Sequence, residues 1–204
     1  MPSMIFWGPP GSGKTTLVRR GVLSRVLDVP AKSINADDFA KELANGGQPT
    51  DEQSLQAAQV SDARVDAEIA AGRSVMVETV LSSDKYKSRV LTAHAGGYHV
   101  VLVYVSMKTA ELNIERVGVR FALGGHDVPR ERILARRTRS HRMFGWFAEQ
   151  ADQVLVFDNS TASPALGALK GPTGWVLHNL DVLPVELALT IRSLAANKDQ
   201  PPQT

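Results

Sequence analysis

The chain has 204 residues, of which 43% are hydrophobic and 22% charged, so its composition is that of a globular domain and excludes wholesale disorder. It contains no cysteine, which removes disulfides, thiolate zinc sites and cysteine nucleophiles. The net charge of +2 does not by itself indicate nucleic-acid binding, and no apolar run approaches the roughly 18 residues that span a membrane. We expect one cytoplasmic domain over residues 1–196 without an export signal, followed by a frayed tail at 197–204.

Strands and helices are predicted in alternation along the chain. In the first part these are a strand at 4–7, a helix at 14–26, a strand at 31–35, helical turns at 37–44, a helix at 51–71 and a strand at 74–79. The second part continues with a helix at 84–95, a strand at 99–106, helices at 109–123 and 130–151, strands at 153–158 and 174–179, and a short C-terminal helix. This alternation predicts an α/β fold with a mostly parallel sheet flanked by helices.

A phosphate-binding motif lies between the first predicted strand and helix. Residues 8–15 read Gly-Pro-Pro-Gly-Ser-Gly-Lys-Thr, which fits G-x-x-x-x-G-K-[ST] at every specified position. Its glycines let backbone N–H groups form an anion-binding concavity, and the helix N-terminus adds the positive end of its dipole. Lys14 is expected to reach the β- and γ-phosphates, and the Thr15 hydroxyl to bind Mg²⁺. The predicted nucleotide-binding residues are Gly8, Pro9, Pro10, Gly11, Ser12, Gly13, Lys14, Thr15 and Thr16.

Two segments place carboxylates directly after predicted strands. Asp37 and Asp38 follow the strand at 31–35, and Glu78 lies at the end of the next strand with Thr79 beside it. Ligands of open α/β sheets bind at the carboxyl ends of strands, so an acid there faces the phosphate loop. Asp37 is a candidate base for an attacking hydroxyl or a Mg²⁺ ligand, with helix capping as the alternative. For Glu78 the choice lies between Mg²⁺ bound through water, a substrate hydroxyl, and an ordinary strand end.

Positive charge is concentrated between residues 108 and 142, where nine of the 23 Lys and Arg residues stand against four acids. Arg116 and Arg120 are four residues apart, so they share one face of the helix predicted there. Beside a glycine-rich loop, these arginines are candidates to close over bound ATP as a lid and neutralise the transferring phosphoryl group. Solvated surface charge is the alternative, as it is for the later Arg136 and Arg137.

The helix at 109–123 also carries an apolar stripe, which predicts its buried face. The stripe consists of Ala110, Ile114, Val117 and Phe121. His126 lies in the loop that follows, where contact with substrate or phosphate is weighed against simple loop structure. The five histidines show no zinc-ligand spacing, so no zinc site is expected.

Several motifs together are more specific than the phosphate loop alone. They are the phosphate loop itself, Asn-Ala-Asp-Asp-Phe at 35–39, Val-Glu-Thr-Val-Leu-Ser-Ser at 77–83, Gly-Tyr-His-Val-Val-Leu-Val-Tyr-Val at 97–105, Glu-Arg-Val-Gly-Val-Arg at 115–120 and Gly-Gly-His-Asp-Val-Pro at 124–129. In these segments the chain resembles the zeta-toxin family of P-loop kinases, whose fold is similar to that of nucleoside monophosphate kinases. The resemblance covers roughly residues 4–160.

The resemblance implies ATP-dependent phosphorylation of a small molecule, which in the toxins is UDP-N-acetylglucosamine. In that pattern Lys14 holds the phosphates, Asp37 activates the substrate hydroxyl, and Glu78 contacts the substrate. Arg116 is implied to stabilise the transferred group. An antitoxin protein is the implied partner.

The sequence departs from the toxins at two places. Their second catalytic arginine falls in the region of the Gly-Gly-His loop, where Arg120 or His126 stands as the substitute. Val80 occupies the place of a substrate-contacting threonine. The UDP-sugar is therefore an analogy drawn from fold and motif.

Three functions compete at this point. The first is a small-molecule kinase that uses ATP, or GTP in its place, with Mg²⁺. The second is a nucleotide-binding ATPase or switch with no acceptor, which would need only a residue that positions water. The third is a polynucleotide kinase or RNA-binding protein, which would need aromatic side chains among the basic residues to stack bases. The carboxylate at Asp37 and the paired arginines favour the kinase.

Overall fold

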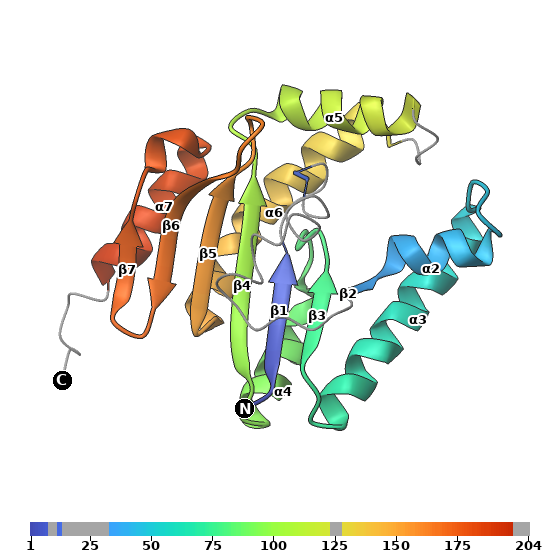
Figure 1. The fold of residues 1–204 in the computed structure, drawn as a ribbon, viewed down its shortest axis with the longest axis horizontal. Helices are drawn as coiled ribbons and strands as arrows, with labels where there is room; N and C mark the ends of the chain where they lie inside the picture. The colour runs from blue at the N-terminus through green and yellow to red at the C-terminus, as the bar shows by residue number, and fades with distance from the viewer. Residues whose placement is uncertain (8–11, 14–32, 123–127, 198–204) are drawn as a thin grey trace.

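The computed structural model describes residues 1–7, 12–13, 33–122 and 128–197, and Figure 1 shows their arrangement. The predicted helix at 14–26, most of the loop at 124–129 and nearly all of the tail at 197–204 lie outside the described residues. The elements in chain order are β1 (Ser3–Trp7), β2 (Ser33–Asn35), α2 (Ala36–Leu43), α3 (Asp51–Ala70), β3 (Val75–Glu78), η1 (Asp84–Tyr86), α4 (Lys87–Ala95), β4 (His99–Ser106), α5 (Ala110–Ala122), α6 (Arg130–Gln150), β5 (Gln153–Asp158), β6 (Ala165–Gly171), β7 (Gly174–Leu177), η2 (Leu180–Val182) and α7 (Val185–Ala196).

The described strands form one sheet in the order β2-β3-β1-β4-β5-β6-β7, with β2 through β5 parallel. Strand β1 lies between β3 and β4, so the chain extends the sheet first to one side of β1 and then to the other (Figure 1). The carboxyl ends of β1, β2 and β3 are level, because Trp7 and Asn35 both stand in register with Glu78. A reversal of strand order of this kind opens a ligand-binding crevice at the carboxyl ends of the strands. The expectation of a mostly parallel α/β sheet flanked by helices is confirmed.

Strand β4 lies at the centre of the core. Its residues from Val100 to Ser106 are all buried, as a strand covered on both faces requires. On one face β4 contributes to a large cluster with side chains of α3, α4, α6 and α7, including Val65, Phe144 and Leu187. Side chains of the other face form a second buried cluster that includes Ile5, Met76, Val101, Val103 and Leu155. The sheet is therefore buried on both sides.

Strand β6 is the one described strand that the sequence did not predict. It pairs antiparallel with β5 and with β7, so the second part of the sheet departs from the parallel pattern. The segment Ala-Leu-Gly-Ala-Leu-Lys-Gly has little of the β-branched and aromatic content typical of strands, and its pairing partners decide its conformation. Gly167 is needed here, because a Cβ atom at this position would lie 2.8 Å from Cδ1 of Leu183.

Lys170 on β6 forms hydrogen bonds that link the sheet to the C-terminal end of α6. Its side chain is buried, and Nζ donates hydrogen bonds to the carbonyl oxygens of Ala148 and Ala151 at 2.8 and 2.6 Å. The last carbonyls of a helix have no partner within the helix, and a cation is the favoured group at that end. The hydrogen bonds to these carbonyls explain why a charged side chain is buried here.

Helix α5 buries most of the predicted stripe but not its C-terminal end. Val117 is buried and Ala110 and Ile114 are half-buried, together with Asn113, whereas Phe121 is 49% exposed. Figure 1 shows α5 lying across the carboxyl end of the sheet next to α6. The Asn113 amide oxygen there accepts a hydrogen bond from Nη1 of Arg137 on α6 at 2.7 Å. This contact between α5 and α6 is made by polar side chains, so the apolar stripe could not predict it.

None of the helices in the described parts of the chain is long and apolar enough to cross a lipid bilayer.

Candidate functional site

The candidate site lies at the carboxyl edge of β1, where the phosphate motif begins. Of the motif, Ser12 and Gly13 are described, while Gly8–Gly11 and Lys14–Thr16 lie outside the described residues. Ser12 is fully buried, and Gly13 has φ +80°, a conformation that L side chains rarely adopt. A Cβ atom at Gly13 would lie 2.3 Å from Nδ2 of Asn159, so the backbone passes too close for any larger residue. The glycine of the motif is therefore needed for both its conformation and its lack of a side chain.

The predicted carboxylates lie along the neighbouring strand ends. Glu78 ends β3, and its Oε2 accepts a hydrogen bond from Nδ2 of Asn35 at 3.1 Å. Asn35 also caps helix α2, because its Oδ1 accepts from the backbone N–H of Asp37 at 2.9 Å. One amide side chain thus holds the start of α2 against the end of β3.

The observed cap of α2 bears on the capping alternative considered for Asp37. The capping residue is Asn35, so Asp37 does not cap the helix with its own side chain. Asp37 and Asp38 are both exposed in the first turn of α2, where the helix dipole favours negative charge. Within the described part of the chain the Asp37 carboxylate makes no hydrogen bond or ion pair. The position suits a base that must stay accessible to substrate.

Thr79 has a local structural contact. Its Oγ1 accepts a hydrogen bond from the backbone N–H of Leu81 at 3.3 Å. Leu81 is buried and has φ +51°, a sparsely populated conformation for a residue with a side chain. Thr79 therefore supports the turn that leaves β3, next to Glu78.

The two lid arginines of α5 differ in their environment. Arg116 is partly buried, and its Nη2 donates to the carbonyl oxygen of Asn159 at 2.7 Å. Its Nη1 lies 3.1 Å from the point where a Cβ atom of Gly13 would stand, so the guanidinium lies against the phosphate motif. Arg120, one turn later, is exposed and makes no ion pair or hydrogen bond to the described residues. The structure brings Arg116, but not Arg120, to the site.

Arg137 serves the scaffold. It is buried, and Nη1 donates to the carbonyl oxygen of Met107 at 2.8 Å as well as to Asn113. Burial lowers its pKa, and Glu111 and Glu186 act in the opposite direction. These bonds tie α6 to the turn between β4 and α5.

Arg136, the neighbouring residue on α6, faces a different environment. Burial first, and then the nearby charge of Arg132, lower the pKa of Arg136, whereas Asp37 acts to raise it. Arg136 makes no ion pair with Asp37 among the described residues, so its place in the site stays a prediction.

Asn159 is the site residue that sequence reasoning missed. It follows β5 directly, is only 6% exposed, and donates from Nδ2 to the carbonyl oxygen of Ser12 at 2.7 Å. The signal was available, because a polar residue after a buried strand had already singled out Asp37 and Glu78. What the sequence did not show was that β5 ends close enough to β1 for this contact. His126 lies outside the described residues.

No group of three or more His, Asp or Glu side chains among the described residues is arranged to hold a metal ion. Mg²⁺ usually takes one or two carboxylates together with substrate phosphates and water. The accessible Asp37 carboxylate at this edge fits that requirement, with Thr15 as the further predicted ligand.

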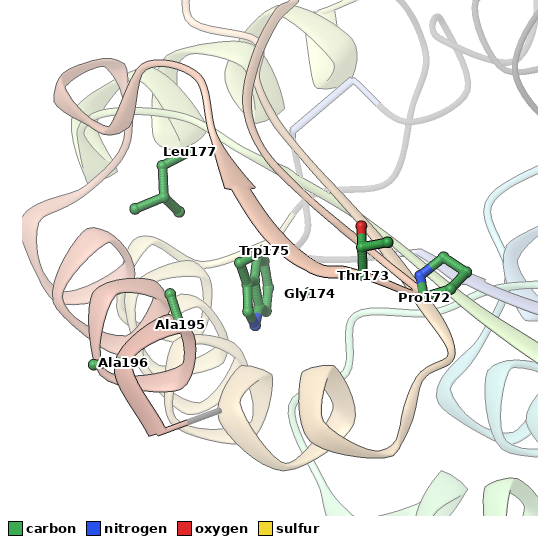
Figure 2. A pocket seen from close by; sticks show the side chains of 7 residues that line it. All are labelled: Pro172, Thr173, Gly174, Trp175, Leu177, Ala195 and Ala196. Atoms are coloured by element: carbon green, nitrogen blue, oxygen red, sulfur yellow. The ribbon is translucent and has the colours of Figure 1, made fainter. Parts of the chain in front are cut away.

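A separate hollow of about 370 Å³ lies between the turn of the β6–β7 hairpin and the end of α7 (Figure 2). It is lined by Pro172, Thr173, Gly174, Trp175, Leu177, Ala195 and Ala196. Lys170, just before this turn, stands in register with Val154 near the start of β5, so the hollow is at the opposite end of the sheet from the phosphate motif. Its lining has no titratable side chain, and we do not assign chemistry to it.

The sheet order and the glycine turn after β1 define a P-loop NTPase domain with a kinase-like sheet. The sequence model of the family described as AAA domain matches residues 4–142, which is more than half of the chain. The chain belongs to this family. No curated protein sequence matches it.

Three solved structures illustrate the likeness of fold. A chain of the AvrRxo1-ORF1:-ORF2 complex with ATP superposes with a TM-score of 0.70 and 17% identity, covering 100% of this chain and 66% of that one. A chain of the PezAT chromosomal toxin-antitoxin system of Streptococcus pneumoniae has a TM-score of 0.59 and 17% identity, covering 100% and 81%. A chain of the Pnkp1/Rnl/Hen1 RNA repair complex has a TM-score of 0.55 and 21% identity, covering 70% and 45%.

These similarities establish the fold and no more, because the identities are low. The chain spans less than two thirds of the RNA repair protein and about two thirds of the AvrRxo1 protein.

Proposed function

We propose that this protein is an ATP-dependent small-molecule kinase that transfers the γ-phosphoryl group to a substrate hydroxyl. The observation that carries the proposal is the placement of Arg116 against Gly13, with the accessible Asp37 carboxylate on the same edge of the sheet. A cation at the phosphate motif and a base at the adjacent strand ends are the two parts that phosphoryl transfer needs besides the loop itself.

The proposed reaction assigns one role to each residue. Asp37 takes the proton of the acceptor hydroxyl, whose oxygen attacks the γ-phosphorus while the bond to the β–γ bridging oxygen breaks and ADP leaves. Lys14 holds the β- and γ-phosphates, and Arg116 stabilises the charge on the transferring group. Glu78, beside Thr79, binds the acceptor.

Three further assignments complete the proposed site. Thr15 would hold Mg²⁺, which would neutralise phosphate charge, and Asp37 would be its second ligand in the alternative in which Asp37 is not the base. Arg120 and His126 are proposed to complete the site from a lid region at about 108–142. The catalytic unit is proposed to be a single domain over residues 1–196.

The proposed acceptor is a UDP-sugar such as UDP-N-acetylglucosamine, and an antitoxin is the proposed partner. Support comes from the zeta-toxin-like motifs together with the structural similarity to a chain of the PezAT toxin-antitoxin system. A chain of the AvrRxo1-ORF1:-ORF2 complex with ATP supports ATP as the donor.

A polynucleotide kinase is disfavoured by the aromatic residues near the basic cluster. Phe144 and Phe147 are buried in the core, where they cannot stack on bases. Trp146 packs edge-on against Phe147, and the ammonium of Lys87 lies 5.2 Å from the Trp146 ring centroid. Only Phe121 in this region is exposed among the described aromatic side chains.

The test is incubation of the protein with ATP, Mg²⁺ and a metabolite panel that includes UDP-sugars, followed by mass spectrometry for the gain of one phosphoryl group. We expect one acceptor class to be phosphorylated by the wild type and not by Lys14→Ala. Consumption of ATP with no phosphorylated metabolite in the panel or in a small-molecule cell extract would favour the ATPase or switch instead. Phosphorylation of an oligonucleotide end would favour the polynucleotide kinase.

A further inference from the structure

Asn159 joins three segments that meet at the carboxyl edge of the sheet. Its backbone N–H donates to the carbonyl oxygen of Ser106 at the end of β4 at 2.9 Å. Its side-chain Nδ2 donates to the carbonyl oxygen of Ser12 in the phosphate motif, and its own carbonyl oxygen accepts from Nη2 of Arg116 on α5, both at 2.7 Å. A single buried residue therefore connects the motif, the central strand and the arginine helix.

The Asn159 amide contacts the residues on both sides of the Ser12–Gly13 peptide bond. Nδ2 bonds to the carbonyl of Ser12, which is fully buried, and it occupies the space where a side chain of Gly13 would begin. Hydrogen bonds between buried groups in a low-dielectric interior are costly to remove. The conformation of the Ser12–Gly13 peptide is thus coupled to the place of the Asn159 amide.

The contact with Arg116 uses the backbone of the same residue. The side chain of Asn159 contacts the motif peptide, and its carbonyl oxygen contacts Arg116. These two contacts therefore set the separation between the motif peptide and the guanidinium. Preplaced charges stabilise a transition state without reorganisation, and a displacement of about 1 Å can cost about 10²-fold in rate.

We propose that Asn159 is a positioning residue that sets Arg116 against the Ser12–Gly13 peptide, so that the γ-phosphoryl group meets a cation already in place. The proposal deepens the proposed function and rests on it for the role of Arg116. It does not depend on the acceptor, because water can also receive the phosphoryl group. The water oxygen attacks the γ-phosphorus, the bond from the γ-phosphorus to the β–γ bridging oxygen breaks, and ADP, inorganic phosphate and a proton result.

The experiment compares Asn159→Ala with Thr161→Val, each in the wild type and in Arg116→Ala. Thr161 is a matched control, because its Oγ1 donates to a backbone carbonyl, that of Ser163, in the same loop but away from the motif. Single-turnover consumption of bound ATP, the Kd of a non-hydrolysable ATP analogue and the thermal midpoint are measured for all variants. Asn159→Ser, which keeps a shorter donor, replaces Asn159→Ala if the latter does not fold.

We expect Asn159→Ala to lower the single-turnover rate about tenfold or more, with a change in analogue Kd below about threefold. In the Arg116→Ala background the same substitution should lower the rate less than about twofold, since the cation it positions is gone. Thr161→Val should leave both quantities near wild type.

Equal rate losses in the two backgrounds, or a loss confined to analogue affinity and thermal stability, would overturn the positioning role and leave Asn159 a structural residue. Failure of the proposed function has a different signature, because ATP is then consumed at an Asn159-dependent rate with no metabolite phosphorylated. A wild type that binds the analogue but consumes no ATP with water or any acceptor would reject both.

Discussion

The side chain of Asn35 donates a hydrogen bond to Oε2 of Glu78 across 3.1 Å, from the end of β2 to the end of β3. Asn35 also caps α2 and so fixes the first turn, in which Asp37 lies. Asn35 therefore ties the Glu78 carboxylate to the backbone of the turn that carries Asp37 and leaves the Asp37 carboxylate accessible.

Asp37→Asn should reduce phosphoryl transfer by about 10²-fold or more and leave ATP affinity within several-fold, because a general base acts in the chemical step. Asp38→Asn is the matched control, since Asp38 is exposed in the same helical turn, and should have a much smaller effect. Transfer rates and equilibrium binding of an ATP analogue check both. If Asp37→Asn weakened only nucleotide binding, Asp37 would belong to the Mg²⁺ shell.

Lys14→Ala should abolish nucleotide-dependent activity and leave the fold intact, because a lysine at this motif position is a point charge on phosphates. Turnover and circular dichroism of the variant check the two halves of this statement. Turnover comparable to the wild type would remove the assignment of the loop.

Arg116→Ala should lower kcat by about 10²-fold or more with a modest change in the Kd for ATP, because its contact matters most in the transition state. Arg120→Ala should have a milder effect, since the Arg120 side chain is exposed one turn further from Gly13. Arg192→Ala, whose side chain is exposed on α7, serves as the control and should change neither quantity. Near-wild-type transfer by Arg116→Ala would show that Arg116 has no part in the chemical step.

Arg137→Met should destabilise the protein by about 2–4 kcal/mol, because it removes the donors that hold Asn113 and the carbonyl of Met107. The rate of transfer per folded molecule should stay within about threefold. Urea unfolding and active-site titration measure the two effects, with the exposed Arg139→Ala as the control. A large loss of rate at unchanged stability would instead make Arg137 part of the catalytic site.

His141 should make stability depend on pH below neutrality. Burial, together with the nearby charge of Arg137, lowers the pKa of His141 to about 4, although Glu186 opposes the shift. A histidine in the unfolded chain has a pKa of about 6.5, so between these values the unfolded chain binds a proton that the folded protein does not. The free energy of unfolding therefore falls by roughly 3 kcal/mol as the pH drops from 6.5 to about 4, and this contribution of His141 is fully present above pH 6.5.

The measurement is urea unfolding at several pH values for the wild type, His141→Gln and the exposed His178→Gln. His141→Gln should flatten the profile between pH 6.5 and 4, while His178→Gln should keep the slope of the wild type. The same slope in all three proteins would show that His141 does not govern acid sensitivity.

Local patterns determined most of the secondary structure. Strands β4 and β5 were predicted with the same bounds as observed, and α6 within a residue, because each is a run of one periodicity with clear ends. Strand β6 could not be found in this way, since its conformation depends on pairing with β5 and β7. Phe121 was placed in the core by its helical position, but α5 meets α6 through Asn113 and Arg137.

By itself the sequence determined that a phosphate motif follows a strand, that Asp37 comes just after the next strand in the chain, and that Glu78 stands at the end of the one after it. Each of these is a relation between residues close in the chain. The tertiary structure decided which distant residues complete the site. Asn159 reaches Ser12 because β1 is inserted between β3 and β4, with β5 beside β4. Arg116 and Arg120 share one helix face in the sequence, yet only Arg116 meets the motif, because the angle at which α5 crosses the sheet is set by packing and not by local pattern.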